Sequence, residues 1–196
     1  YFIIIAIIIA IGLIAFFYTF YNKGVVNPTE LVKTTGLLAI SLLAITLFVG
    51  PASRVFSFFE TFKANRKVWG VLSFWAAIAH MLLVVNFYWN WNLGRFIDFS
   101  SPRYPAVGAG SLGLIILALV TFTSSEKMIK ALTPSVWKLI QTTSYLAMAS
   151  SLLHFYFVAF KAGSLSFRNS LSQTVFYFCI LVIIARITIL FLPKKK

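Results

Sequence analysis

Acidic residues, cysteines and histidines are scarce in this sequence of 196 residues. The 4 Asp and Glu residues, against 17 Lys and Arg, lie far apart in the chain and are expected in loops. No pair of carboxylates is therefore predicted for acid–base catalysis. The single cysteine, Cys179, excludes an internal disulfide and a Cys/His metal cluster. His80 and His154 remain as the candidate metal ligands.

Apolar residues are abundant. The chain is 60% hydrophobic and 17% aromatic, with a mean hydropathy of +0.92, which is more apolar surface than a soluble domain of this size buries. Several apolar runs approach the roughly 20 residues that cross a bilayer, and no alternating strand pattern is present. We predict an all-α integral membrane protein. Its single domain, 1–196, would form a six-transmembrane-helix bundle with helices at about 2–21, 35–49, 68–86, 106–123, 136–160 and 174–192.

The basic residues indicate how the helices are oriented. Lys and Arg are more frequent after the second and fourth predicted helices and at the C-terminus than in the other connections. The positive-inside rule then predicts both termini on the cytoplasmic side of a multi-pass protein in the cell inner membrane. The net charge of +13 is assigned to this orientation and to anionic membrane lipid, and not to nucleic acid.

The two histidines lie at similar depths in two predicted helices. His80 follows Arg66 by about 21 Å of helix and His154 follows Trp137 by about 25 Å, at 1.5 Å per residue. Both therefore fall in the outer half of the membrane, on helices that run in the same direction. An ionisable side chain inside a membrane helix is costly and indicates function. We expect both imidazoles to bind one metal, a haem iron.

The neighbours of the histidines are small. Ala76 and Ala77 precede His80 by one turn, and Ser150 and Ser151 precede His154 by one turn, which leaves room for a flat macrocycle. Ser150 is a candidate acceptor for the His154 ring. Two alternatives remain open at this point: each histidine forms polar contacts between helices, or each binds the magnesium of a chlorophyll-type pigment.

Four short motifs occur in a fixed order along the chain. They are Thr46-Leu47-Phe48-Val49-Gly50-Pro51-Ala52-Ser53-Arg54, then Arg66-Lys67-Val68-Trp69-Gly70-Val71 leading to His80, then Thr123-Ser124, and finally Trp137-Lys138-Leu139-Ile140-Gln141-Thr142-Thr143-Ser144-Tyr145 leading to His154. Over about 36–160 the chain resembles the ferric reductase-like transmembrane domain family. Within that family it most resembles the haem-binding membrane subunits of the MsrQ type.

The resemblance implies one b-type haem held by His80 and His154, and a departure at a second site. Related oxidases and reductases stack two haems, whereas Gln141 stands here where the family has an inner histidine. Together with Arg66, Gln141 is a candidate for binding a flavin or a quinone headgroup. Contact of Arg66 with helix ends and phospholipid is the simpler interpretation.

The resemblance also implies a function. The chain would move electrons across the membrane, from a cytoplasmic-side quinol or flavin donor to an outer-side acceptor or partner reductase, as an electron-transfer subunit. No Gly-rich dinucleotide fingerprint is present, so a nucleotide-linked donor would be a separate protein. The alternative is a non-catalytic structural subunit of a larger redox or photosynthetic membrane complex, with the haem site retained or lost.

Three further expectations concern the connections. The second helix should stop near Pro51, because proline is common just past a helix end. The aromatic and basic segment 53–67 should lie on the membrane surface. Trp89, Trp91, Arg95 and Arg103 would form an interfacial aromatic belt, or would contact haem propionates or an outer partner. No internal repeat is evident in the sequence.

Overall fold

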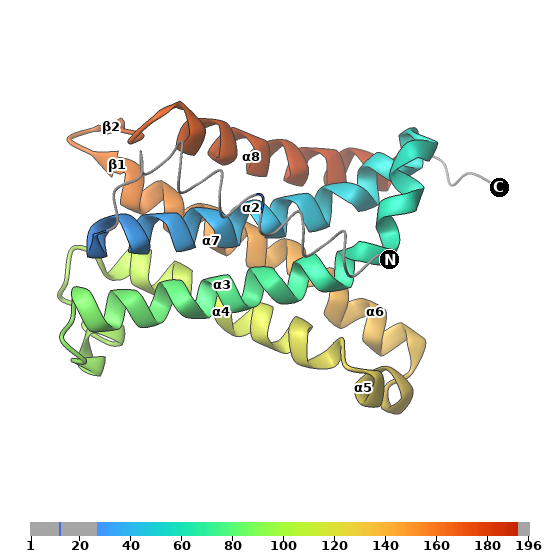
Figure 1. Ribbon diagram of the computed structural model, residues 1–196, viewed down its shortest axis with the longest axis horizontal. Helices are drawn as coiled ribbons and strands as arrows, with labels where there is room; N and C mark the ends of the chain where they lie inside the picture. The colour runs from blue at the N-terminus through green and yellow to red at the C-terminus, as the bar shows by residue number, and fades with distance from the viewer. Residues whose placement is uncertain (1–11, 13–26, 192–196) are drawn as a thin grey trace.

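The computed structural model describes residue 12 and residues 27–191 (Figure 1). The predicted helix 2–21 lies outside the described residues, apart from Gly12. The described helices are α2 (Pro28–Val55), η2 (Ser57–Asn65), α3 (Arg66–Phe87), η3 (Leu93–Phe96), α4 (Tyr104–Thr123), α5 (Glu126–Ala131), α6 (Pro134–Thr142), α7 (Ser144–Ala159) and α8 (Ser170–Phe191). Strands β1 (Phe160–Lys161) and β2 (Ser164–Leu165) form a small antiparallel hairpin.

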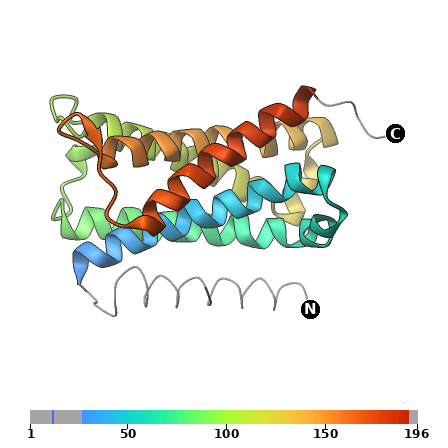
Figure 2. The same ribbon diagram turned by 90° about the horizontal axis from the view of Figure 1, so that it is seen from above.

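The long helices lie side by side along the long axis of the molecule, and α8 crosses the bundle obliquely (Figures 1 and 2). One end, here called the hairpin end, holds β1, β2, the α3–α4 connection and the start of α2. The other, here called the η2 end, holds η2, α5 and α6. The buried core draws on five helices and includes Leu43 and Leu47 of α2, Phe74 of α3, Leu117 of α4, Met148 of α7 and Val182 of α8.

Four helical stretches are long and apolar enough to cross a membrane: Pro28–Val55, Ser57–Phe87, Tyr104–Thr123 and Ser170–Phe191. They confirm the prediction of a helical membrane protein. The third, fourth and sixth predicted helices match α3, α4 and α8 to within a few residues. The predicted helix 136–160 is two helices, α6 and α7, because the chain bends at Thr143.

The prediction that α2 stops near Pro51 is wrong. The helix begins at Pro28, capped by the Asn27 side chain, and continues through Pro51 to Val55. Proline lacks the N–H that would bond to the carbonyl four residues earlier, which here belongs to Leu47. The Tyr145 hydroxyl donates to that carbonyl at 3.1 Å. A side chain from α7 therefore replaces the missing backbone donor, and the helix passes the proline.

We expect Tyr145→Phe to destabilise the bundle by about 1–2 kcal/mol, because the Leu47 carbonyl then loses its donor in an apolar surrounding. Thermal unfolding in detergent measures the change. Tyr177→Phe is the matched control, because Tyr177 is an exposed residue of α8 for which the described part of the chain shows no hydroxyl hydrogen bond. Equal unfolding midpoints for the two variants would argue against a role for this bond.

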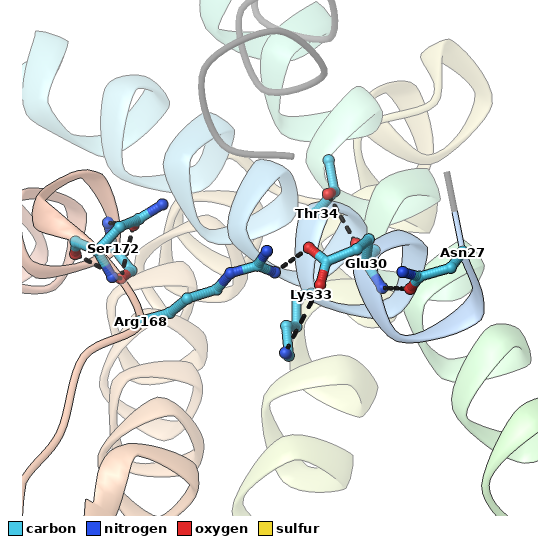
Figure 3. A network of polar contacts seen from close by, with 7 residues as sticks. Asn27, Glu30, Lys33, Thr34, Arg168 and Ser172 are labelled. Carbon is cyan, nitrogen blue, oxygen red and sulfur yellow. Dashed lines mark hydrogen bonds and ion pairs between the residues drawn. The ribbon is translucent and has the colours of Figure 1, made fainter. Parts of the chain in front are cut away.

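The connections at the two ends differ in character. The segment predicted to lie on the membrane surface contains the 3₁₀ helix η2, with Phe56 and Phe58 exposed. At the hairpin end, Glu30 is buried within α2, whereas the sequence suggested a loop position. Figure 3 shows Arg168, from the segment before α8, and Lys33 both approaching its carboxylate. The Arg168–Glu30 ion pair joins the start of α2 to the segment that enters α8, whereas the Lys33–Glu30 pair lies within α2.

Candidate functional site

His80 of α3 and His154 of α7 face each other inside the bundle. Their ring centroids are 6.0 Å apart, and the rings are inclined at 79°. An imidazole nitrogen lies about 2 Å from a metal that it binds, so two rings on opposite sides of one metal have centroids about 6 Å apart. The predicted juxtaposition of the two histidines is therefore present in the fold, at a separation that suits one shared ion.

A backbone carbonyl from a neighbouring helix fixes each imidazole. His80 Nδ1 lies 2.8 Å from the Val32 oxygen of α2, and His154 Nδ1 lies 2.7 Å from the Ala106 oxygen of α4. A carbonyl oxygen only accepts, so each Nδ1 must carry the proton and donate it. Each Nε2 is then the unprotonated nitrogen with a lone pair. This is the tautomer in which a histidine binds a metal.

These carbonyls replace the partner expected from the sequence. Ser150 was a candidate acceptor for the His154 ring, but the ring bonds to Ala106 and the buried Ser150 is not its partner. The prediction considered only residues one turn away on the same helix. The actual partner lies 48 positions earlier in the chain, on a different helix.

Glycine permits both contacts. A Cβ atom on Gly36 of α2 would lie 2.9 Å from the His80 ring, and one on Gly110 of α4 would lie 2.8 Å from the His154 ring. Real side chains essentially never approach so closely, so neither ring could keep its position beside an alanine. Gly110 was not among the predicted site residues, although each glycine lies the same number of positions before its histidine, which is a signal that the sequence alone carries.

The two histidine environments are copies of one arrangement. The carbonyl residue lies 48 positions before its histidine in both cases, and the glycine follows the carbonyl residue by one helical turn. The pair α2 and α3 therefore repeats in the pair α4 and α7. This shared spacing of contact positions was not evident as a repeat in the sequence by itself.

We expect Gly36→Ala and Gly110→Ala each to displace one imidazole and to lower the affinity for haem by about 10- to 100-fold. Loss of a group that orients a metal ligand has an effect of this size. Haem retained per chain after purification measures the effect. Gly70→Ala is the control, because a Cβ there would meet only the Thr46 methyl, at an ordinary 3.7 Å. Full retention in both test variants would show that the rings tolerate displacement.

A second feature is a cavity of about 520 Å³ at the η2 end, between α2, α3, α4, α6, α7 and α8. Arg66 and Gln141, paired in the sequence analysis, both line it. Its charged lining is entirely basic, and no described Asp or Glu lines it. The cations are Arg54, Lys63, Arg66, Lys67, Lys138 and Arg186.

Arg66 and Gln141 are held by neighbouring helices. The Arg66 Nε atom donates a hydrogen bond to the Thr46 carbonyl of α2 at 3.0 Å. This bond fixes the orientation of the guanidinium group. Gln141 Nε2 lies 3.1–3.3 Å from three oxygens of α4 and its end: the Val120 carbonyl and the hydroxyls of Thr123 and Ser124. Every described bond of the Gln141 side chain uses its nitrogen, which leaves its oxygen as an acceptor.

Three other cavity residues were missed as site residues. The Trp137 indole nitrogen is buried and has no described hydrogen-bond partner, although it is a donor that normally finds one. The Arg186 guanidinium lies over the Tyr145 ring, 5.0 Å from its centroid. Arg186 belongs to a predicted membrane-spanning helix, and the fold turns its side chain into the cavity.

The described helices and the two imidazoles define a helical membrane protein with a close pair of histidine rings in its interior. The chain belongs to the ferric reductase like transmembrane component family, whose sequence profile matches residues 35–152. This confirms the predicted family resemblance.

The chain is also similar to named proteins of two kinds. It is 29% identical over 123 residues to the magnetosome protein MamZ of Magnetospirillum gryphiswaldense, covering 62% of this chain and 18% of that protein. It is 25% identical to the protein-methionine-sulfoxide reductase heme-binding subunit MsrQ of Polaromonas naphthalenivorans, covering 81% of this chain and 69% of that protein. The MsrQ of Herminiimonas arsenicoxydans is 22% identical and covers 98% of this chain and 84% of its own length. The chain thus spans less than a fifth of the magnetosome proteins that it matches.

Proposed function

We propose that this chain is a membrane cytochrome that binds one haem b between His80 and His154 and conducts electrons across the membrane. One observation supports this above the others: both imidazoles have their protons held on Nδ1 by carbonyls, with the rings separated as one shared iron requires. The MsrQ relatives are named heme-binding subunits.

The residues present fit such a group. The imidazoles of His80 and His154 would hold it, and the Val32 and Ala106 carbonyls keep those rings in place. When bound by two histidines, such a group would supply reversible one-electron chemistry rather than oxygen binding. The protein's part is to hold two neutral ligands in an apolar interior and to exclude water from them.

The proposal includes a topology. Six spans with both termini cytoplasmic would place the η2 end inside and the hairpin end outside. The basic residues of the cavity, η2 and α5 lie at the η2 end, as the positive-inside rule requires of a cytoplasmic face. The cell inner membrane is the location that this topology suits, and membrane lipid is the surrounding partner. Residues 1–196 would form a single domain.

Electrons would enter at the cavity of the η2 end, from a flavin or a quinol, and leave at the outer side to an acceptor or partner reductase. The basic lining favours an anionic or carbonyl-bearing redox group, with Arg66 as cation and with the Gln141 oxygen and Trp137 N–H as hydrogen-bonding groups. The chain would then act as the electron-transfer subunit of an oxidoreductase, and the printed name of its MsrQ relatives, a reductase subunit, accords with this.

A dithionite-reduced minus oxidised visible spectrum of the purified chain, with a pyridine haemochrome assay, tests the proposal. One low-spin b-type haem per chain is expected. Two haems would mean that the cavity at the η2 end binds iron through other ligands. No haem would overturn the cytochrome proposal and favour a structural subunit of a larger membrane complex.

A further inference from the structure

The hairpin end contains a second pocket, of about 320 Å³, that the proposed function does not use. It is lined by the arginines Arg95 and Arg103 and by Tyr88, Trp89 and Val107. Val107 adjoins Ala106, whose carbonyl holds His154. The pocket therefore lies beside the start of α4, the part of that helix whose carbonyl holds His154.

The two arginines of this pocket differ in their partners. Arg95 pairs with Asp98 at 3.7 Å. For Arg103, no ion pair occurs within residues 27–191. It immediately precedes α4, a helix of 20 residues whose free N–H groups add positive potential at that end. Arg103 is therefore the cation of the pocket that is free to meet an anion.

The wall of the pocket is fixed by an unusual turn. Asn90 and Trp91 adopt left-handed backbone angles, with φ of 47° and 63°, directly after α3. The Trp91 backbone N–H donates to the Val85 carbonyl at 3.0 Å, and its indole N–H donates to the Asn86 side chain at 3.0 Å. Such angles are costly for non-glycine residues, and these two bonds hold the turn that carries Trp89 and Arg95.

We propose that this pocket is a carboxylate site in which Arg103 is the main partner and Arg95 the second. The inference rests on the proposed haem. Carboxylates left in hydrocarbon are costly, so the propionates of a group held by His80 and His154 must extend to the nearer end of the bundle, which is the hairpin end. Guanidinium binds carboxylate through two parallel hydrogen bonds. A small soluble carboxylate, such as the ligand of a metal chelate, offers the same chemistry.

The experiment compares Arg103→Gln with the unsubstituted full chain by haem assay and by redox titration, with and without citrate. We expect unchanged haem content and a more negative midpoint potential, because the guanidinium favours the form that has gained an electron. The shift in midpoint potential should be at most about 59 mV, which corresponds to a tenfold change in the ferrous/ferric equilibrium for one electron. Arg103→Lys should retain most of the original potential. Lys161→Gln, which removes an exposed cation of the hairpin outside the pocket, should leave it unchanged.

The outcomes separate the two sources of carboxylate. A shift without citrate identifies a haem propionate. An unchanged potential in buffer, with loss of a citrate-induced shift that the unsubstituted chain shows, identifies an external carboxylate. Unchanged behaviour in both conditions overturns the carboxylate site while leaving the haem in place. If the unsubstituted chain shows no haem spectrum, the proposed function fails instead. Arg103 is exposed, so its substitution leaves the packed core intact.

Discussion

Replacing His80 or His154 by alanine is expected to lower haem affinity by at least about 100-fold and to leave the purified chain almost free of haem. Loss of groups that only orient a ligand costs about 10- to 100-fold in metal affinity, and loss of the ligand itself should cost more. Both rings lie in the bundle interior, where no other described histidine can replace them. The pyridine haemochrome assay measures the loss directly.

Two controls make this result specific. Leu82→Ala in α3 and Leu153→Ala in α7 alter side chains that are 44% and 52% exposed on the same two helices, and both should retain full haem content. His154→Met retains a possible ligand and should give a bound haem of more positive potential. A His154→Ala chain that keeps the spectrum of the unsubstituted protein would contradict the assignment of the axial ligands.

Arg66→Gln is expected to weaken binding of the proposed electron donor or cofactor at the η2-end cavity by about 10- to 100-fold, while the haem spectrum stays unchanged. A hydrogen bond to a charged group contributes about 1.5–3 kcal/mol, and each 1.4 kcal/mol is a factor of ten. The variant keeps a polar side chain that can still reach the Thr46 carbonyl, so the packing of α3 on α2 is preserved. Reduction of the haem by a soluble flavin or quinol at rising concentration measures the change.

The control for Arg66 is Lys130→Gln. Lys130 is an exposed residue of α5 at the same end of the bundle, and it does not line the cavity. If both variants weaken donor binding equally, the effect comes from the general positive potential of the surface and not from the cavity. Salt sensitivity of donor binding that disappears in Arg66→Gln would identify the Arg66 charge as the cause.

Much of the fold could be predicted from the sequence, because the length of an apolar run is a local property of the chain. Apolar runs of roughly the length of a bilayer define α3, α4 and α8 whatever surrounds them. The errors occurred where a contact from another helix overrides the local signal. Pro51 does not end α2, because Tyr145 of α7 supplies a donor to the Leu47 carbonyl. The turn at Thr143 separates the more polar helix α6 from the more apolar helix α7, a change in composition that the predicted single helix 136–160 did not take into account.

For the candidate site, too, the sequence predicted some features, and others depended on contacts between helices. Counting residues along each helix placed His80 and His154 at one depth, because the rise per residue in a helix is constant. Depth says nothing of rotation about the helix axis, which decides what a ring faces. The sequence therefore suggested Ser150 as a partner, whereas α4 presents the Ala106 carbonyl. Likewise, only the packing of α8 places the Arg186 side chain in the cavity.

The sequence by itself determined that this is a helical membrane protein of the ferric reductase-like family with two histidines at matched depth, because composition, run length and spacing are properties of the chain alone. Only the tertiary structure decided the protonated nitrogen of each imidazole, the pairing of each ring with a glycine, and the gathering of cations from four helices and η2 around one cavity. These features depend on contacts between residues far apart in the chain, and such contacts are fixed by how whole helices rotate and pack.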